Sequence, residues 1–198
     1  DEERLGQVQA YVNRAIEGHG LPAECIASTD RNELLPGADF VVTAVSIGGA
    51  AYWGEPYASE IGIPLEYGVH QPVADTVGVG GVFRFLRTAH EHLQFCKDME
   101  VQCPDALMLN YTNPMAMLTW LHSEGSSIQN VGLCHSVQGT TKKLADAVDA
   151  PYEEVSYLVA GINHQAWVLR LRRRGKDLYP KLREVLDTHP SFEEDQVR

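Results

Sequence analysis

The chain has 198 residues, enough for one well-buried domain or for part of a larger one. Its 16 basic and 27 acidic residues give a net charge of −11. Such an acidic surface repels nucleic-acid phosphate backbones and anionic lipid, which argues against nucleic-acid and membrane-surface partners. Apolar residues make up 44% of the chain, as in globular proteins, and no stretch approaches the roughly 18 uninterrupted apolar residues of a membrane span.

The N-terminal part is predicted to contain one helix and two strands before a long irregular segment. Apolar residues at helical spacing predict a helix over residues 2–18. A short strand is expected over residues 24–28. The continuous apolar run over residues 40–45 is typical of a strand buried on both faces of a parallel sheet. Residues 50–78 carry three prolines and scattered glycines, so we expect a long loop, which in a compact domain is usually functional.

The following part alternates between helices and strands. We expect helices over residues 82–100, from Pro114 onward and over 138–148, separated by strands over 106–109 and 131–134. Residues 155–160 and 166–171 then predict an antiparallel pair. The alternating units imply an α/β fold, a parallel sheet with helices on both faces. A shift in composition near Ala150 marks the passage into a second, α+β domain.

Three polar clusters follow the carboxyl ends of predicted strands, which is where parallel sheets bind ligands. The clusters are Ser46-Ile47-Gly48-Gly49, Asn110-Tyr111-Thr112-Asn113-Pro114 and Cys134-His135-Ser136-Val137. Their coincidence at the strand ends predicts a functional site. The sequence contains four cysteines without a CxxC pair, which does not indicate a disulfide framework, so a reducing cytoplasm is the expected compartment.

Cys134 and His164 are candidate metal ligands. Cys134 ends a predicted strand, and His164 lies in the short connection of the antiparallel pair among polar residues. Two protein ligands are too few for a closed structural site but leave positions for substrate and water, as a catalytic metal requires. The alternative is that Cys134 is a small core residue, the commonest state of a free cysteine.

The asparagines and glycines of these clusters each have a structural and a ligand-binding interpretation. Asn113, just before Pro114, is well placed to cap a helix. Alternatively, Asn110 and Asn113 hydrogen-bond sugar hydroxyls or a nicotinamide ribose. Gly48 and Gly49 allow the backbone to approach a phosphate at a helix start, although ordinary turns also need glycine.

Four segments, taken in order, resemble glycoside hydrolase family 4. They cover residues 76–88, 110–116, 132–140 and 161–164, and the similarity runs through essentially the whole chain. Four separated motifs in register are far more specific than any one of them. The Cys-His-Ser-Val tetrad at residues 134–137 is the signature associated with the α-galactosidase branch.

The resemblance implies a Rossmann-like fold and a set of site residues. Residues 1–150 would be a partial NAD-binding domain, with Ser46, Gly48, Gly49 and Asn110 at the cofactor, and residues 151–198 the start of the substrate and metal domain. Cys134 and His164 would hold a divalent ion, usually manganese, and Asn113 would contact substrate hydroxyls. Judged by ligand softness alone, a Cys/His pair would favour zinc, cobalt or nickel over manganese. Manganese is expected here because the resemblance implies it.

The resemblance also implies an unusual way of hydrolysing an α-galactoside. NAD⁺ takes a hydride from C3, the resulting ketone acidifies the C2 proton, and the aglycone leaves from C1 by elimination before water adds and the hydride returns. His135 is the candidate acid for the leaving oxygen, and its alternative role is to select the sugar.

The chain is expected to be a fragment. The family's glycine-rich nucleotide loop would lie upstream and the tyrosine proposed as the C2 base downstream, so we expect this piece to be inactive alone, with a homo-oligomeric parent. Alternatives are another family 4 specificity (α-glucosidase, α-glucuronidase or galacturonidase), an oxidoreductase of the lactate/malate dehydrogenase type and a non-catalytic sugar- or metal-binding module.

Overall fold

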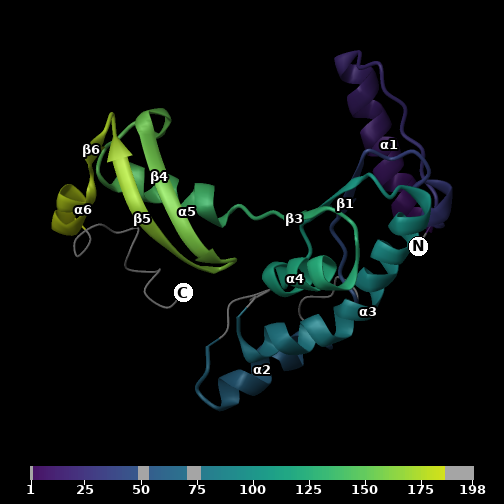
Figure 1. Ribbon diagram of the computed structural model, residues 1–198, viewed down its shortest axis with the longest axis horizontal. Helices are drawn as coiled ribbons and strands as arrows, with labels where there is room; N and C mark the ends of the chain where they lie inside the picture. The colour runs from purple at the N-terminus through teal and green to yellow at the C-terminus, as the bar shows by residue number, and fades with distance from the viewer. Residues whose placement is uncertain (1, 49–53, 71–76, 186–198) are drawn as a thin grey trace.

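The computed structural model describes residues 2–48, 54–70 and 77–185, which form two lobes (Figure 1). The first lobe contains α1 (Glu2–His19), a 3-10 turn (Arg31–Glu33), β1 (Phe40–Thr43), α2 (Tyr57–Glu66), α3 (Val79–Gln102), β2 (Leu107–Asn110), α4 (Met115–Gly125) and β3 (Asn130–Gly132). The second lobe contains α5 (Ser136–Ala147), a 3-10 turn (Tyr152–Glu154), β4 (Val155–Ile162), β5 (Gln165–Arg173), β6 (Lys176–Asp177) and α6 (Tyr179–Val185).

The first lobe is built on a parallel sheet in the order β1-β2-β3, which confirms the predicted Rossmann-like α/β class. Val41 on β1 pairs with Met108 on β2, and this face of the sheet packs toward α3. Phe40 and Val42, the alternate residues of β1, are 65% and 59% exposed. Alternation along the strand therefore gives one covered face and one exposed apolar face at β1.

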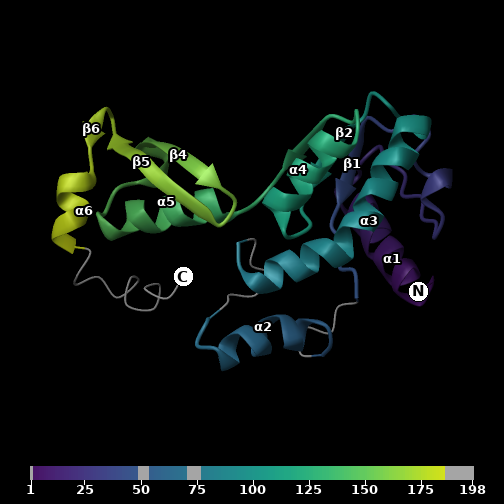
Figure 2. The same ribbon diagram turned by 60° about the horizontal axis from the view of Figure 1, so that its bottom comes forward.

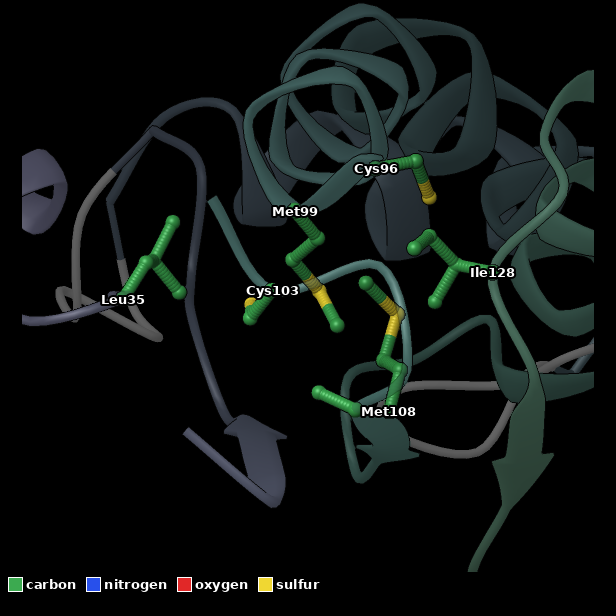
Figure 3. Close-up of a cluster of buried hydrophobic side chains, with 7 residues drawn as sticks. Leu35, Cys96, Met99, Cys103, Met108 and Ile128 are labelled. Atoms are coloured by element: carbon green, nitrogen blue, oxygen red, sulfur yellow. The ribbon is translucent and has the colours of Figure 1, made fainter. Parts of the chain in front are cut away.

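The core of the first lobe lies between the sheet and α3 (Figure 3). Met99 from α3 and Met108 from β2 are fully buried, and their side chains point toward one another. The full cluster consists of Leu35, Cys96, Met99, Cys103, Ala106, Met108 and Ile128. Cys96 and Cys103 pack here as small apolar residues, and all four cysteines are free, in agreement with the predicted lack of a disulfide framework.

The second lobe is an antiparallel sheet in the order β4-β5-β6, packed on α5 and α6. Val159 pairs with Val168, and a β-bulge follows Leu158. Leu171 on β5 is fully buried against Ala145 of α5 and Leu182 of α6. The predicted antiparallel pair is therefore confirmed. Since α5 already contributes to this second core, the domain division at residue 150 stays a prediction.

Two predicted segments differ from the structure. Residues 24–28 form no strand: the Cys25 carbonyl accepts a hydrogen bond from the Gln9 side chain, and no neighbouring strand of the described residues pairs with this segment. The irregular segment expected at residues 50–78 contains α2, despite Pro64 within the helix. Within the described residues, every helix is too short or too polar to serve as a membrane-spanning segment.

Candidate functional site

Cys134 and His164 meet where the two lobes join. Cys134 lies in the short link between the end of β3 and the start of α5, and His164 lies in the turn between β4 and β5. Both views place this turn at the end of the second lobe nearest the first (Figures 1 and 2). The Cys134 Sγ atom is 3.4 Å from the His164 Nε2 atom. Residues 30 positions apart are thus brought into direct contact.

The conformation of the β4–β5 turn depends on Gly161 and on the pairing of the strands. Ile162 pairs with Gln165, so that only two residues connect the strands. Gly161 has a φ of 142°, and a Cβ atom there would lie 2.4 Å from the Gln165 carbonyl oxygen. His164 itself has a φ of 63°, in the left-handed region that side chains other than glycine rarely adopt. The strand register and this left-handed residue together direct the imidazole toward Cys134.

Several hydrogen-bond donors surround the Cys134 sulfur. The Ser136 hydroxyl lies 3.1 Å and the Ser136 amide nitrogen 3.4 Å from Sγ. Burial raises the pKa of the Cys134 thiol, but the hydrogen bonds from Ser136, Asn163 and the His135 amide outweigh it and leave the pKa below its ordinary value. Because Cys134 belongs to neither buried cluster, its environment differs from that of Cys96 and Cys103.

The Cys134–His164 pair fits a divalent ion with open coordination positions. Metal–sulfur and metal–nitrogen bonds of about 2.3 and 2.1 Å separate the two ligand atoms by about 3.1 Å at a right angle and about 3.6 Å at a tetrahedral angle. The observed 3.4 Å lies between these values. Among the described residues no group of three or more His, Cys, Asp or Glu side chains that could hold a metal ion occurs. Two protein ligands leave coordination positions open for water and substrate oxygens.

A polar pocket of about 270 Å³ opens at the carboxyl ends of β1 and β2. Its lining comes from the two loops that follow these strands and from α2 and α3: Ala44, Val45, Ser46, Ile47, Tyr57, Arg84, Thr88, Tyr111, Thr112 and Asn113. Ser46 and Asn113, predicted from the strand-end clusters, both line it. Gly48 lies beside it with a φ of 101°, where a Cβ atom would be 3.1 Å from Pro56. Gly49 lies outside the described residues.

The two asparagines of the second cluster have different environments. Asn110 is fully buried, and its side-chain oxygen accepts hydrogen bonds from the Thr43 hydroxyl and the Thr112 amide. Asn110 therefore joins the ends of β1 and β2, and its cofactor contact stays a prediction. The Asn113 side-chain oxygen accepts a hydrogen bond from the amide of Met115, the first residue of α4, but Pro114 and not Asn113 occupies the N-cap position; Asn113 also lines the pocket. The substrate role of Asn113 likewise stays a prediction.

A buried charged cluster that was not predicted from the sequence contributes Arg84 to the pocket lining. Glu60 of α2 accepts two hydrogen bonds from Arg84 of α3, at 2.8 and 3.0 Å, and also pairs with Arg87. The Arg84 guanidinium lies 4.3 Å from the centre of the Tyr57 ring. Arg87 donates to the Ile47 carbonyl and so ties α3 to the loop after β1. In the sequence, the signal for this cluster was the spacing of Arg84 and Arg87, which lie about one turn apart on a predicted helix.

His135 lies between Cys134 and α5 and has an aromatic neighbour in the pocket lining. It occupies the position before the first residue of α5 and is exposed. Its ring centre is 6.0 Å from that of Tyr111, which lines the pocket. His135 is thus next to Cys134 in the sequence, and its ring lies near a residue of the pocket lining.

Comparison with protein families and with curated proteins relates the chain to glycosyl hydrolases. The model of the family described as family 4 glycosyl hydrolase matches residues 1–150, and that of its C-terminal domain matches residues 159–198. An α-galactosidase of Rhizobium meliloti (strain 1021) is 39% identical over 193 residues, covering 96% of this chain and 39% of the relative. An α-galacturonidase of Thermoanaerobacterium saccharolyticum is 37% identical over 186 residues, covering 90% of this chain and 38% of the relative.

Solved structures show the same fold. The 6-phospho-β-glucosidase of Thermotoga maritima, crystallised with manganese, NAD⁺ and glucose-6-phosphate, superposes with a TM-score of 0.78 at 24% identity, covering 98% of this chain and 47% of that one. The chain thus spans about two fifths of the length of the curated relatives it matches. By the two family models and the identity to these relatives, the chain belongs to glycosyl hydrolase family 4.

Proposed function

We propose that the full-length protein hydrolyses α-galactosides with the help of NAD⁺ and a divalent metal ion, and that this chain carries the metal ligands and part of the cofactor and sugar sites. The observation that carries the proposal is the 3.4 Å contact between Cys134 and His164 beside a polar pocket lined by Ser46 and Asn113. Two ligands with open positions are what a metal acting on a sugar requires.

Each of these residues has a proposed role that follows from its position in the structure. Cys134 and His164 would hold the ion, Ser46 and the backbone at Gly48 would face the cofactor, and Asn113 would orient the sugar. When bound, NAD⁺ supplies a hydride acceptor and the metal supplies electrostatic stabilisation of the charge that develops on the sugar oxygens. The buried Glu60–Arg84 pair would keep the pocket wall rigid.

Hydrolysis in deuterium oxide tests the reaction class. If the C2 proton leaves during turnover, solvent deuterium should appear at C2 of the product sugar, as measured by NMR or mass spectrometry. A direct displacement by two carboxylates leaves that C–H bond intact, so a product without deuterium would contradict the proposed reaction.

His135 is the proposed acid for the leaving oxygen, because it is exposed at the start of α5 beside Tyr111 and histidine is the side chain most often used for general acid–base catalysis. A nitrophenyl leaving group needs little protonation. His135→Ala should therefore lower kcat for a galactosyl disaccharide by about 10²-fold or more while affecting a nitrophenyl galactoside far less. An equal loss for both substrates would instead make His135 a binding residue.

Family membership removes the dehydrogenase alternative, and the remaining question is the sugar. The proposal of galactosides rests on the Cys-His-Ser-Val tetrad and on the identity to an α-galactosidase along 96% of the chain. Initial rates with nitrophenyl α-galactoside, α-glucoside and α-galacturonide distinguish the family 4 specificities. A sugar-binding protein without turnover would release nitrophenol from none of them.

The cellular setting is proposed on separate grounds. The four free cysteines of the chain are compatible with a reducing compartment, and we propose the cytoplasm. The proposed partners are a small glycoside and further copies of the same chain, and the net charge of −11 argues against nucleic acid.

A further inference from the structure

Ser136 offers the Cys134 sulfur two donors at once. Its hydroxyl lies 3.1 Å and its backbone amide 3.4 Å from Sγ. Ser136 is also the first residue of α5, a helix of 12 residues, so its amide belongs to the helix end whose N–H groups have no partner within the helix. The serine therefore faces the sulfur on the side of α5, while His164 approaches the same atom from the β4–β5 turn.

These contacts bear on a chemical mismatch in the site. A thiolate is a soft ligand that favours zinc over manganese, whereas manganese prefers hard oxygen ligands. Hydrogen bonds to a metal-bound sulfur withdraw electron density from it and make it a weaker, harder donor, and such contacts are known to tune metal–thiolate centres. Once a metal holds the sulfur as a thiolate, the Ser136 hydroxyl can only donate to it.

We propose that Ser136 is a positioning residue that shifts the metal preference of the site toward manganese: its two hydrogen bonds to Cys134 weaken the thiolate as a ligand and reduce the advantage of zinc. This inference rests on the proposed function, because it presupposes that Cys134 and His164 bind a divalent ion. Of the two hydrogen bonds, only the one from the hydroxyl depends on the side chain, so a substitution can remove it while the amide stays.

The test uses the full-length protein with Ser136→Ala and Ser136→Thr, and Thr140→Ala as the matched control. Thr140 is an exposed residue of the same helix, so its replacement also removes one hydroxyl from α5. Dissociation constants for Mn²⁺ and Zn²⁺ are measured by competition with a chelating dye, and the cobalt-substituted protein reports the sulfur directly through its thiolate-to-metal charge-transfer band.

Ser136→Ala should raise the ratio of zinc to manganese affinity by about 10-fold or more, the scale on which outer contacts of metal ligands act. Its cobalt band should move to longer wavelength because the sulfur becomes richer in electrons. Ser136→Thr keeps the hydroxyl and should restore both values, and Thr140→Ala should match the wild type. A residue that merely stabilised α5 would move neither the ratio nor the band.

Two negative results have different meanings. A wild-type protein with a cobalt–thiolate band that Ser136→Ala leaves unshifted, together with an unchanged affinity ratio, overturns the inference and leaves the proposed function standing. A wild-type protein without any such band overturns the metal assignment and with it both proposals.

Discussion

Replacement of Cys134 by serine should abolish divalent-metal binding in the full-length protein and its activity with it. A serine hydroxyl is a much poorer ligand than a thiolate, and His164 alone cannot hold the ion. Since even outer contacts of metal ligands are worth about 10–100-fold in affinity, loss of a direct ligand should cost at least about 100-fold. Metal content by inductively coupled plasma mass spectrometry and a Mn²⁺ titration measure the effect.

Cys25→Ser is the matched control for this experiment. Cys25 is also a free, partly exposed cysteine, and its backbone carbonyl accepts a hydrogen bond from the Gln9 side chain. The variant should keep the metal content and the activity of the wild type. Chelation should reproduce the Cys134→Ser phenotype in the wild-type protein, and added Mn²⁺ should restore only the wild type. A Cys134→Ser protein that retains stoichiometric metal would contradict the assignment of Cys134 as a ligand.

The parallel sheet could be predicted from the sequence because its signals are local. The apolar runs that became β1 and β2 are each followed by a polar cluster, and both clusters now lie at the same edge of the sheet. The antiparallel pair was equally visible, since a glycine and polar residues separate its two apolar strands. These elements needed no knowledge of tertiary contacts.

Other features depend on contacts that the sequence does not display. Helix α2 contains Pro64, which local propensity disfavours, and its Glu60 is tied to Arg84 and Arg87 of α3. The strand expected at residues 24–28 has no partner strand among the described residues. Tertiary contacts therefore decided against both local predictions.

The candidate site was predictable in part. Spacing alone could not bring Cys134 and His164 together, because their approach depends on the register of β4 and β5 and on the left-handed turn at His164. Their placement at a strand end and in a polar turn made them candidate partners, and the family resemblance strengthened the pairing. The contact of Ser136 with the sulfur could not be predicted from the Cys-His-Ser-Val tetrad, because it depends on side-chain geometry at the start of α5.

A second large effect is expected from a pair of histidines away from the site. His92 of α3 and His122 of α4 are fully buried, and the Nδ1 atom of His92 lies 2.9 Å from the Nε2 atom of His122. The other two ring nitrogens, Nε2 of His92 and Nδ1 of His122, are buried without a hydrogen-bond partner among the described residues. One ring must donate to the other, so both are accommodated as neutral imidazoles, and a charge on either would lack an acceptor.

Burial lowers the pKa of His92 to about 4, with a further contribution from His122, and burial likewise lowers the pKa of His122 to about 4. In the unfolded chain both would titrate near the ordinary value of 6.5. Between these values the unfolded state binds more protons, so the stability that the pair contributes is present above pH 6.5 and is lost as the pH falls toward 4.

The free energy of unfolding should therefore fall by about 3 kcal/mol for each ring across this window, with a slope of up to about 2.7 kcal/mol per pH unit if both rings titrate together. Urea unfolding of the full-length protein at intervals between pH 7 and 4 measures it. The double variant His92→Gln/His122→Gln removes both titrating rings and should flatten the curve relative to wild type, although the loss of packing lowers its stability at pH 7.

His90→Gln is the matched control, because His90 lies on the same helix with its side chain 87% exposed, and its loss should leave the slope unchanged. Carboxylates elsewhere add their own acid sensitivity to every variant, so the deciding quantity is the difference in slope between the double variant and the wild type. Parallel curves for these two proteins between pH 6.5 and 4 would mean that the buried pair accepts protons as readily as the unfolded chain does. A steeper wild-type curve would instead place an acid-sensitive contact between α3 and α4, behind the helix whose Arg84 lines the pocket.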